Sequence, residues 1–166
     1  YCGHEGMSPD DETNAFFTQM LQDTGVEVMG RNTYDLMYPY WHEVAVNQSG
    51  TQSENEFAQA FDAVQKIVFS RTMKSAAWVN TTLLHSGLGE EIQKLKEQPG
   101  KDIFIGGLNL GSQVAKLGLI DEYYFVVHPA IVGKGPRLFE DGGEHRLTLV
   151  ETRTFRSGVV MLHYKK

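Results

Sequence analysis

Two adjacent glycines lie where a strand pattern changes into a helix pattern, and such a turn can bind an anion. The apolar run Ile103–Ile105 is typical of a buried parallel strand, and Gly106-Gly107 ends it. The first turn of the helix that follows has free backbone N–H groups at the positive end of its dipole, which favours a group such as the pyrophosphate of a nucleotide. A turn whose glycines only let the helix pack closely on the strand is the structural alternative. The donors would come from Leu108, Asn109, Leu110, Gly111 and Ser112.

A second turn of this kind follows the strand pattern Val26–Met29. Gly30-Arg31-Asn32-Thr33 would open the next helix, and Arg31 has the planar fork of donors that suits phosphate. The alternative is an ordinary helix start capped by Asn32 or Thr33. Ser70-Arg71-Thr72 ends a third strand pattern, Lys66–Phe69, and is unremarkable by itself.

Ring-bearing side chains gather after the second turn, at Tyr34, Tyr38, Tyr40, Trp41 and His42. Such a cluster either packs in the core or over a pocket edge, or it forms a platform for a flat heterocycle, and the sequence leaves both readings open. The six histidines show no metal spacing, because none forms an i, i+4 pair or a facial triad with a carboxylate. We therefore expect no bound metal.

The composition is that of one ordinary globular domain. The chain has 166 residues, of which 41% are hydrophobic and 22% charged. No stretch reaches the roughly 18 apolar residues that a transmembrane helix needs, so no membrane association is expected. The net charge of −6 argues against a nucleic-acid partner and means that local donors must hold any anionic ligand. The single cysteine, Cys2, excludes an internal disulfide and fits the cytoplasm.

The pattern of elements alternates between strands and helices, which predicts a three-layer α/β/α sandwich. A helix starts at Pro9–Glu12 and ends at Gly25, and another runs from Arg31 to about Tyr38, where Pro39 breaks it. Residues Val44–Ser53 read as a surface loop. The remaining expected helices are Glu54–Val64, Gly89–Gln98 and one ending near Gly118, and the remaining strands are Ala76–Val79, Tyr123–Val127, Leu147–Phe155 and Val159–Tyr164. The sheet should be mostly parallel, with an antiparallel C-terminal hairpin turning at Arg156-Ser157-Gly158.

Four blocks in order resemble the dihydrofolate reductase-like superfamily, most closely the C-terminal reductase domain of bifunctional riboflavin-biosynthesis proteins. Val28–Tyr34 resembles the turn that dihydrofolate reductases write as Met-Gly-Arg-x-Thr-Trp, and Ile67–Thr72 resembles the strand that ends at the adenosine 2′-phosphate. Leu95–Asp102 resembles the small stand-alone bacterial members, and Asp102–Phe139 carries the Gly-Gly cofactor loop. The end of this last block, the loop from His128 to Phe139, resembles the corresponding loop of the riboflavin branch. Lys134 and Arg137 in this loop would either contact a ribose phosphate of the substrate or be solvated surface charges.

The resemblance implies an NADPH-dependent reductase of a pyrimidine or pteridine-type heterocycle. Its nearest named activity is 5-amino-6-(5-phosphoribosylamino)uracil reduction in riboflavin biosynthesis. The implied cofactor residues are Gly30, Arg31, Asn32, Thr33, Ser70, Arg71, Thr72, Gly106, Gly107, Leu108, Asn109, Leu110 and Gly111, and the implied substrate residues are Tyr34, Tyr38, Trp41, Lys134 and Arg137. Two arginines and two hydroxyls around one site would favour NADPH over NADH.

The catalytic acid is not identified by the resemblance. Dihydrofolate reductases place a carboxylate in their first helix, and the corresponding position here is Asn14, which is not a proton donor of that kind. Asp10, Asp11 and Glu12 lie one turn upstream, where acidic residues commonly complement the helix start. Two alternatives therefore stay open: a dihydrofolate reductase with a relocated acid, and a nucleotide-binding module without turnover.

The resemblance also bears on the chain start and on assembly. Family members begin with an apolar strand that ends in an Asp-Gly-aromatic turn, and Tyr1 fits the aromatic residue. We expect a strand of about 5–10 residues, internal to the sheet, to be missing from a single domain that spans residues 1–166. The riboflavin-branch reductases pair as homodimers, so a homodimer is expected.

Overall fold

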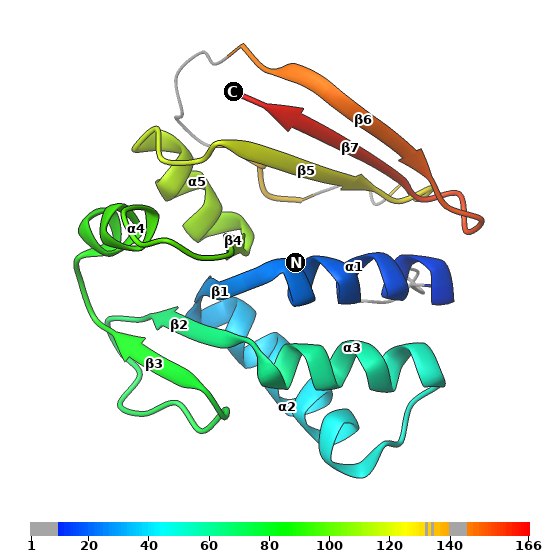
Figure 1. Ribbon diagram of the computed structural model, residues 1–166, viewed down its shortest axis with the longest axis horizontal. Coiled ribbons are helices and arrows are strands. Elements are labelled where there is room, and N and C mark those ends of the chain that lie inside the picture. Colours follow the sequence, from blue (N-terminus) through cyan, green and yellow to red (C-terminus); the bar gives the residue numbers. More distant parts are fainter. Residues whose placement is uncertain (1–9, 132, 134, 140–145) are drawn as a thin grey trace.

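The chain folds as an α/β protein of five helices and seven strands over its described residues (Figure 1). The computed structural model describes residues 10–131, 133, 135–139 and 146–166. The helices are α1 (Asp11–Asp23), α2 (Arg31–Asn47), α3 (Gln52–Ala63), α4 (Leu88–Lys96) and α5 (Leu108–Lys116). The strands are β1 (Thr24–Gly30), β2 (Gln65–Phe69), β3 (Thr81–Leu84), β4 (Asp102–Gly106), β5 (Glu122–Val127), β6 (Thr148–Thr154) and β7 (Val160–Lys165).

The first four strands form a parallel sheet in the order β3-β2-β1-β4. In the middle of this sheet, Val28 pairs with Ile67 of β2 on one side and with Ile105 of β4 on the other. Because all four strands run in the same direction, their carboxyl ends meet at one edge. The turns after Gly30, Phe69, Leu84 and Gly106 therefore share that edge.

Helices cover both faces of the parallel sheet, as the sandwich prediction requires. One core joins Leu21, Tyr34 and Phe61 of α1, α2 and α3 to Met29 and Val68. The opposite core joins side chains of α4 and α5 to the other face of β1 and β2, with Ile92, Leu110, Val114, Val28 and Ile67 at its centre. Successive strand residues point to opposite faces, so the continuous apolar strands supply both cores.

The last three strands form a separate antiparallel sheet in the order β5-β7-β6. Its β6–β7 turn contains Gly158 at a φ of 84°, as the hairpin prediction expected. Phe155, Val159 and Met161 of this hairpin pack against Phe16 of α1. Figure 1 accordingly shows α1 between the three-stranded sheet and α3.

A partly open cavity of about 720 Å³, lined by both apolar and charged side chains, lies between the two sheets. Among the described strands, β4 is one of the two outer strands of the parallel sheet, and β5 is one of the two outer strands of the antiparallel sheet. Both strands line the cavity, together with α1, through Phe17, Met20, Ile103, Ile105, Tyr123 and Phe125. The parallel and antiparallel parts were predicted, but their separation into two sheets was not.

The helix break predicted at Pro39 was wrong, and so was the loop predicted from residue 44. Helix α2 continues through Pro39 to Asn47 and ends at Gln48, whose φ is 52°. A proline inside a helix removes one backbone donor. Here the proline ring is exposed, and buried Val44 ties the following turns to the protein. Packing has therefore overridden the local preference.

The strand predicted at residues 76–79 was also wrong. The backbone N–H groups of Ala77 and Trp78 donate to the Tyr34 hydroxyl, at 2.9 and 3.1 Å, and not to a neighbouring strand. The strand comes directly afterwards, as β3, because Asn80 turns the chain with a φ of 56°. No helix within the described part of the chain is long and apolar enough to cross a membrane.

Candidate cofactor and substrate site

The candidate site lies at the carboxyl ends of the adjacent parallel strands β1 and β4. The helices that follow these two strands pack on opposite faces of the sheet. At the edge of the pairing between β1 and β4, Met29 aligns with Gly106. The chain leaves β1 into α2 on one face and leaves β4 into α5 on the other. Such a switch point opens a crevice beyond the carboxyl ends of the strands, where open α/β sheets bind their ligands.

Gly107 joins the two turns that the sequence predicted separately. Its φ of 92° is a conformation that side chains with a Cβ rarely adopt. A Cβ at this position would lie 2.2 Å from the Thr33 hydroxyl oxygen in the first turn of α2. Gly107 therefore allows the starts of α2 and α5 to touch.

The helices that start at this crevice have no side-chain cap among the described residues. Gly30 is the N-cap of α2 and Gly107 that of α5, and neither accepts a hydrogen bond through a side chain. By contrast, Asp10 caps α1 and Thr51 caps α3 with side-chain oxygens. The predicted alternative of an Asn32 or Thr33 cap is not what the structure has. The first-turn N–H groups of α2 and α5 remain the natural donors for an anion.

Arg31 and the turn after β2 come together as expected. The Arg31 guanidinium donates to the Thr72 hydroxyl at 2.9 Å. The buried Ser70 hydroxyl accepts from the backbone N–H groups of Thr72 and Met73, which shapes the turn. Arg71 is exposed on the same turn. Arg31 is also paired with Asp35 at 3.0 Å, so a carboxylate already neutralises part of its charge.

The aromatic residues predicted near the substrate pack mainly on one another. Tyr34 is 5% exposed, and its ring stacks on Tyr38 with the centroids 5.3 Å apart. The Tyr34 hydroxyl is used by the backbone of residues 77 and 78. Trp41 is half-buried against Phe57. These contacts are those of a core, and they leave Tyr34 no free face for a ligand.

With this geometry in view, comparison with known proteins identifies the family. The sequence model described as the RibD C-terminal domain matches residues 3–161. The chain belongs to the RibD C-terminal domain family. It is a family of reductases, and its members are typically NAD(P)H-dependent.

Two Bacillus subtilis (strain 168) proteins are similar in sequence. The chain is 36% identical over 154 residues to the uncharacterized protein YyaP, covering 89% of this chain and 77% of that one. It is 29% identical over 139 residues to the uncharacterized protein YwjB, covering 81% and 79% of the two chains.

Two crystal structures share the fold. A protein from Shewanella sp. PV-4 named for riboflavin biosynthesis gives a TM-score of 0.69 at 19% identity, over 98% of this chain and 84% of that one. A pyrimidine reductase-like protein from Corynebacterium diphtheriae gives 0.58 at 17% identity, over 94% and 82%. The expected RibD C-terminal, dihydrofolate reductase-like fold is thereby confirmed.

Two of the acidic residues at the start of α1 hold the C-terminal hairpin, and the third, Asp11, accepts a hydrogen bond from the Ser53 hydroxyl. Asp10 accepts from the Thr13 side chain and backbone and from the Ser157 backbone, and the Thr13 bonds lower the pKa of its carboxyl group. Glu12 accepts from the Arg156 backbone at 3.0 Å. Asn14 is buried and donates to Ser53 at 3.2 Å. All three side chains therefore have structural partners in this RibD C-terminal domain.

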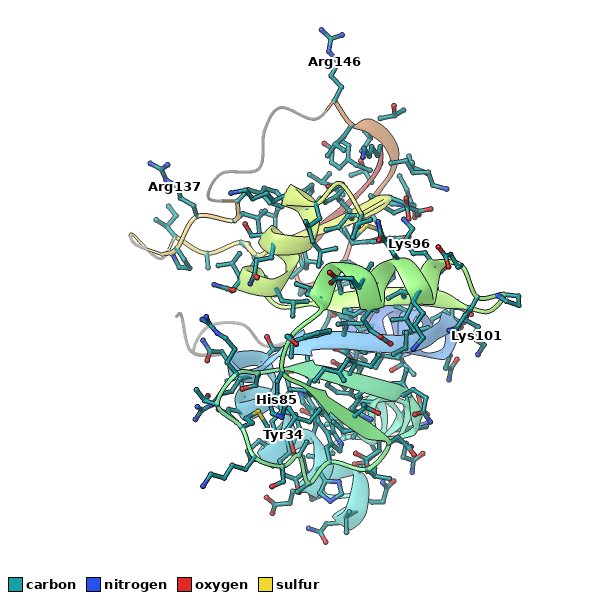
Figure 2. The ribbon with its side chains drawn as sticks, turned by 90° about the vertical axis from the view of Figure 1, so that its left-hand side faces the viewer. Tyr34, His85, Lys96, Lys101, Arg137 and Arg146 are labelled. Carbon is teal, nitrogen blue, oxygen red and sulfur yellow. The ribbon has the colours of Figure 1, made fainter. Side chains whose placement is uncertain are left out.

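Of the two loop cations predicted for the substrate, one lies in the described part of the loop after β5. Lys134 lies outside the described residues. Arg137 is exposed and projects outward from the loop after β5 (Figure 2). Of the two, the structure therefore describes only Arg137, and it does not place that side chain against the starts of α2 and α5.

Sequence reasoning missed two polar residues beside the crevice, Glu27 and His85. Glu27 is 4% exposed, its Oε2 has no hydrogen-bond partner within the described structure, and burial raises its pKa to about 8. Its Oε1 lies 3.0 Å from where a Cβ on Gly106 would stand, directly behind the glycine turn. An acid inside the apolar run Val26–Met29 was the available signal. His85 follows β3 at the same sheet edge as the turn at residues 70–72, which only the pairing of β2 with β3 reveals.

Proposed function

We propose that this protein is an NADPH-dependent reductase of a pyrimidine or pteridine-type heterocycle. The observation that carries the proposal is the contact of Gly107 with Thr33, which brings two uncapped helix starts together at the switch point. A Cβ at residue 107 would overlap the Thr33 hydroxyl, so only glycine lets the two helix starts meet here, where their N–H groups could bind a cofactor pyrophosphate. Membership of the RibD C-terminal domain family supports the same cofactor class.

The proposed preference for NADPH over NADH rests on Arg31 and the turn at residues 70–72. Arg31 already contacts Thr72, so two arginines and two hydroxyls gather at the edge of the crevice. Each charge-assisted contact to a 2′-phosphate would contribute roughly 1.5–3 kcal/mol. We expect NADPH to bind more tightly than NADH, and Arg71→Ala to lose much of the difference. Equal dissociation constants in the wild type would contradict the preference.

The bound cofactor would supply a hydride to the substrate. The protein's part in such a reaction is binding and orientation. The starts of α2 and α5 would hold the pyrophosphate through backbone donors, and Arg31 with the 70–72 turn would fix the adenosine end. These contacts set the cofactor's direction along the sheet edge.

For the substrate, the nearest named candidate is 5-amino-6-(5-phosphoribosylamino)uracil, the substrate of the riboflavin-biosynthesis reductases that this chain resembles. A riboflavin-biosynthesis protein and a pyrimidine reductase-like protein share the fold, which supports this choice. The dihydrofolate alternative is disfavoured, because Asn14 replaces the expected acid and the acids beside it hold the hairpin.

The deciding experiment follows NADPH absorbance at 340 nm with each candidate heterocycle. We expect oxidation with the phosphoribosylaminouracil and none with dihydrofolate. Titration of NADPH and NADH by protein fluorescence runs in parallel. Binding of NADPH without oxidation by any heterocycle would instead favour a nucleotide-binding module.

We further propose a homodimer. The antiparallel sheet exposes Val127, Leu149 and Val150 by about half of their surface, and two-fold pairing is the commonest way to cover such residues. Light scattering at micromolar concentration should give about twice the chain mass of 18.7 kDa. A mass equal to one chain would contradict the proposal.

A further inference from the structure

A buried carboxyl group lies directly behind the glycine turn, outside the groups so far assigned to a ligand. Glu27 of β1 is 4% exposed, and its Oε2 has no hydrogen-bond partner within the described structure. Its Oε1 lies 3.0 Å from the place where a Cβ on Gly106 would stand. None of the ion pairs among the described residues includes Glu27. A negative charge at this place is therefore screened neither by water nor by a described cation in contact with it.

The helices packed over Glu27 bring no buried charge to it. Glu27 points to the same face of β1 as Met29, which α1, α2 and α3 cover. None of the buried residues of these three helices is charged. The titratable one among them is Tyr34, whose hydroxyl accepts from the backbone of residues 77 and 78. Arg31 and Asp35 in the first turn of α2 are half exposed and pair with each other.

The charged group that acts on Glu27 from the sheet is Lys66, the aligned residue of β2. Its Nζ donates to the backbone oxygens of residues 62 and 64, at 3.1 and 2.8 Å, near the start of the strand. The Glu27 carboxyl group reaches the other way, toward Gly106 at the end of β4. On β4 itself, the residues beside Glu27 are Phe104 and Gly106, which carry no charge. Lys66 therefore leaves Glu27 without a partner at the glycine turn.

The position of Glu27 matters for an anion at the starts of α2 and α5. Gly106 directly precedes Gly107, the N-cap of α5. A diphosphate at these helix starts and an ionised Glu27 would lie on two sides of one glycine pair, where charges repel more strongly than in water. A neutral Glu27 exerts no such repulsion. Burial disfavours the ionised form and raises the pKa of Glu27 to about 8, so both forms are accessible near neutral pH.

We propose that the protonation state of Glu27 controls cofactor binding: the protein binds the diphosphate of a dinucleotide while Glu27 is neutral and releases it when Glu27 is ionised. This inference rests on the proposed function. Glu27 contacts no ligand itself, since Gly106 lies between the two, and it acts through its charge alone. Because ligand binding favours the protonated form, the affinity is highest below the pKa of Glu27 and falls as the pH rises through it.

The test follows the affinity for NADH between pH 7 and pH 9 at constant ionic strength. NADH is the probe because its diphosphate keeps its charge in this range, whereas a phosphate monoester such as the 2′-phosphate of NADPH titrates near pH 6. Fluorescence titration should show roughly ten-fold weaker binding by wild type at pH 9 than at pH 7, since one proton is linked to binding. Glu27→Gln, which is neutral at every pH, should lose no more than about two-fold. Lys66, whose pKa burial lowers to about 8, is present in both proteins, so the difference between them reports Glu27.

Wild type alone provides a second test that needs no variant. Calorimetry at pH 8 in two buffers with different ionisation enthalpies should show an uptake of about half a proton per bound NADH, because Glu27 is half ionised at its pKa. Glu43→Gln on the exposed face of α2 is the matched control for the titrations, and it should keep the wild-type pH profile.

The outcomes separate the role of Glu27 from the proposed function. A flat wild-type profile, or a Glu27→Gln profile that falls as steeply as that of wild type, overturns the inference. Calorimetry without proton uptake overturns it too. In each of these cases, binding of NADH and NADPH at pH 7 leaves the proposed function intact. If wild type binds neither cofactor at pH 7, the proposed function fails and the inference fails with it.

Discussion

The carboxyl edge of the parallel sheet and the divide between the two sheets are built in opposite ways. At the sheet edge, Gly107 touches Thr33, and Arg31, Thr72, Ser70 and His85 are linked by hydrogen bonds. At the divide, strands β4 and β5 face a partly open cavity of about 720 Å³. The side chains at the sheet edge are held by direct contacts, whereas the space between the two sheets is open.

This difference assigns the two halves of the proposed reaction to different kinds of surface. A cofactor phosphate needs fixed donors, and a preformed edge reduces the entropy lost on binding. For the heterocycle, the aromatic cluster packs internally and Asp10 and Glu12 hold the hairpin, so neither group is a preformed set of donors. Cofactor binding is accordingly the property that the geometry supports most directly.

The largest effect is expected from breaking the preformed edge at Gly107. Gly107→Val would place a branched side chain against Thr33 at a φ that disfavours it, so the cradle could not close around a phosphate. We expect at least about 100-fold weaker NADPH binding, because two or more charged hydrogen bonds are lost. Fluorescence titration measures the affinity, and circular dichroism checks that the variant is folded.

The matched control for this variant is Gly100→Ala. No atom lies within 4 Å of a Cβ at residue 100, so its binding should equal that of wild type. A folded Gly107→Val protein with wild-type affinity would refute the cradle.

Glu27, directly behind the glycine turn, should make stability depend on pH. Burial raises its pKa from 4.5 to about 8, so between these values the folded state keeps a proton that the unfolded chain releases. Stability therefore falls as pH rises through this window, by up to about 1.4 kcal/mol per pH unit. Lys66 is 1% exposed, and burial lowers its pKa from 10.5 to about 8. Its effect on the free energy of unfolding therefore appears only above pH 8, where it makes the protein more stable as the pH rises.

The variant Glu27→Gln removes this titration and isolates it. We expect its free energy of unfolding, relative to wild type, to increase by more than about 1 kcal/mol between pH 5 and pH 8. Urea unfolding at several pH values measures the difference, and Glu43→Gln on the exposed face of α2 serves as control. Parallel pH profiles for wild type and Glu27→Gln would mean that Glu27 is ionised in the folded protein.

The sequence predicted the parts of the edge but not how they fit. Glycine pairs, an arginine and strand-end hydroxyls are local signals, and the structure confirms the strands and helix starts that carry them. The contact between Gly107 and Thr33, and the position of His85, depend on which strands are neighbours, and local patterns do not contain that information. The predictions of a helix break at Pro39 and of a strand at residues 76–79 were wrong for the same reason, because both depended on local sequence alone. Packing of α2 overrode the proline, and the Tyr34 hydroxyl took the backbone donors that a strand would have used.

Hydrogen exchange can test whether the divide is as open in solution as in the structure. Strands β1 and β2 are paired on both sides, whereas β4 and β5 each pair on one side only within the described sheets. Amides on the free edges of β4 and β5 should exchange at least about ten-fold faster than those of β1 and β2, because they have no strand partner. Mass spectrometry of peptic fragments gives the comparison. Equal protection in all four strands would show that the divide is closed, and the contrast between the two regions would disappear.

The smallest effect is expected from a substitution that strengthens cofactor binding at the sheet edge. Asp35 pairs with Arg31 at 3.0 Å, and both side chains are 51% exposed, so the pair contributes at most about 1 kcal/mol. In Asp35→Asn, Arg31 is released for the 2′-phosphate, and NADPH should bind about two- to five-fold more tightly. NADH affinity should stay the same, because it has no phosphate at that position. Asp23→Asn makes the same change in net charge at the far end of α1 and should alter neither affinity. An equal gain for both cofactors in Asp35→Asn would place Arg31 on the pyrophosphate and not on the 2′-phosphate.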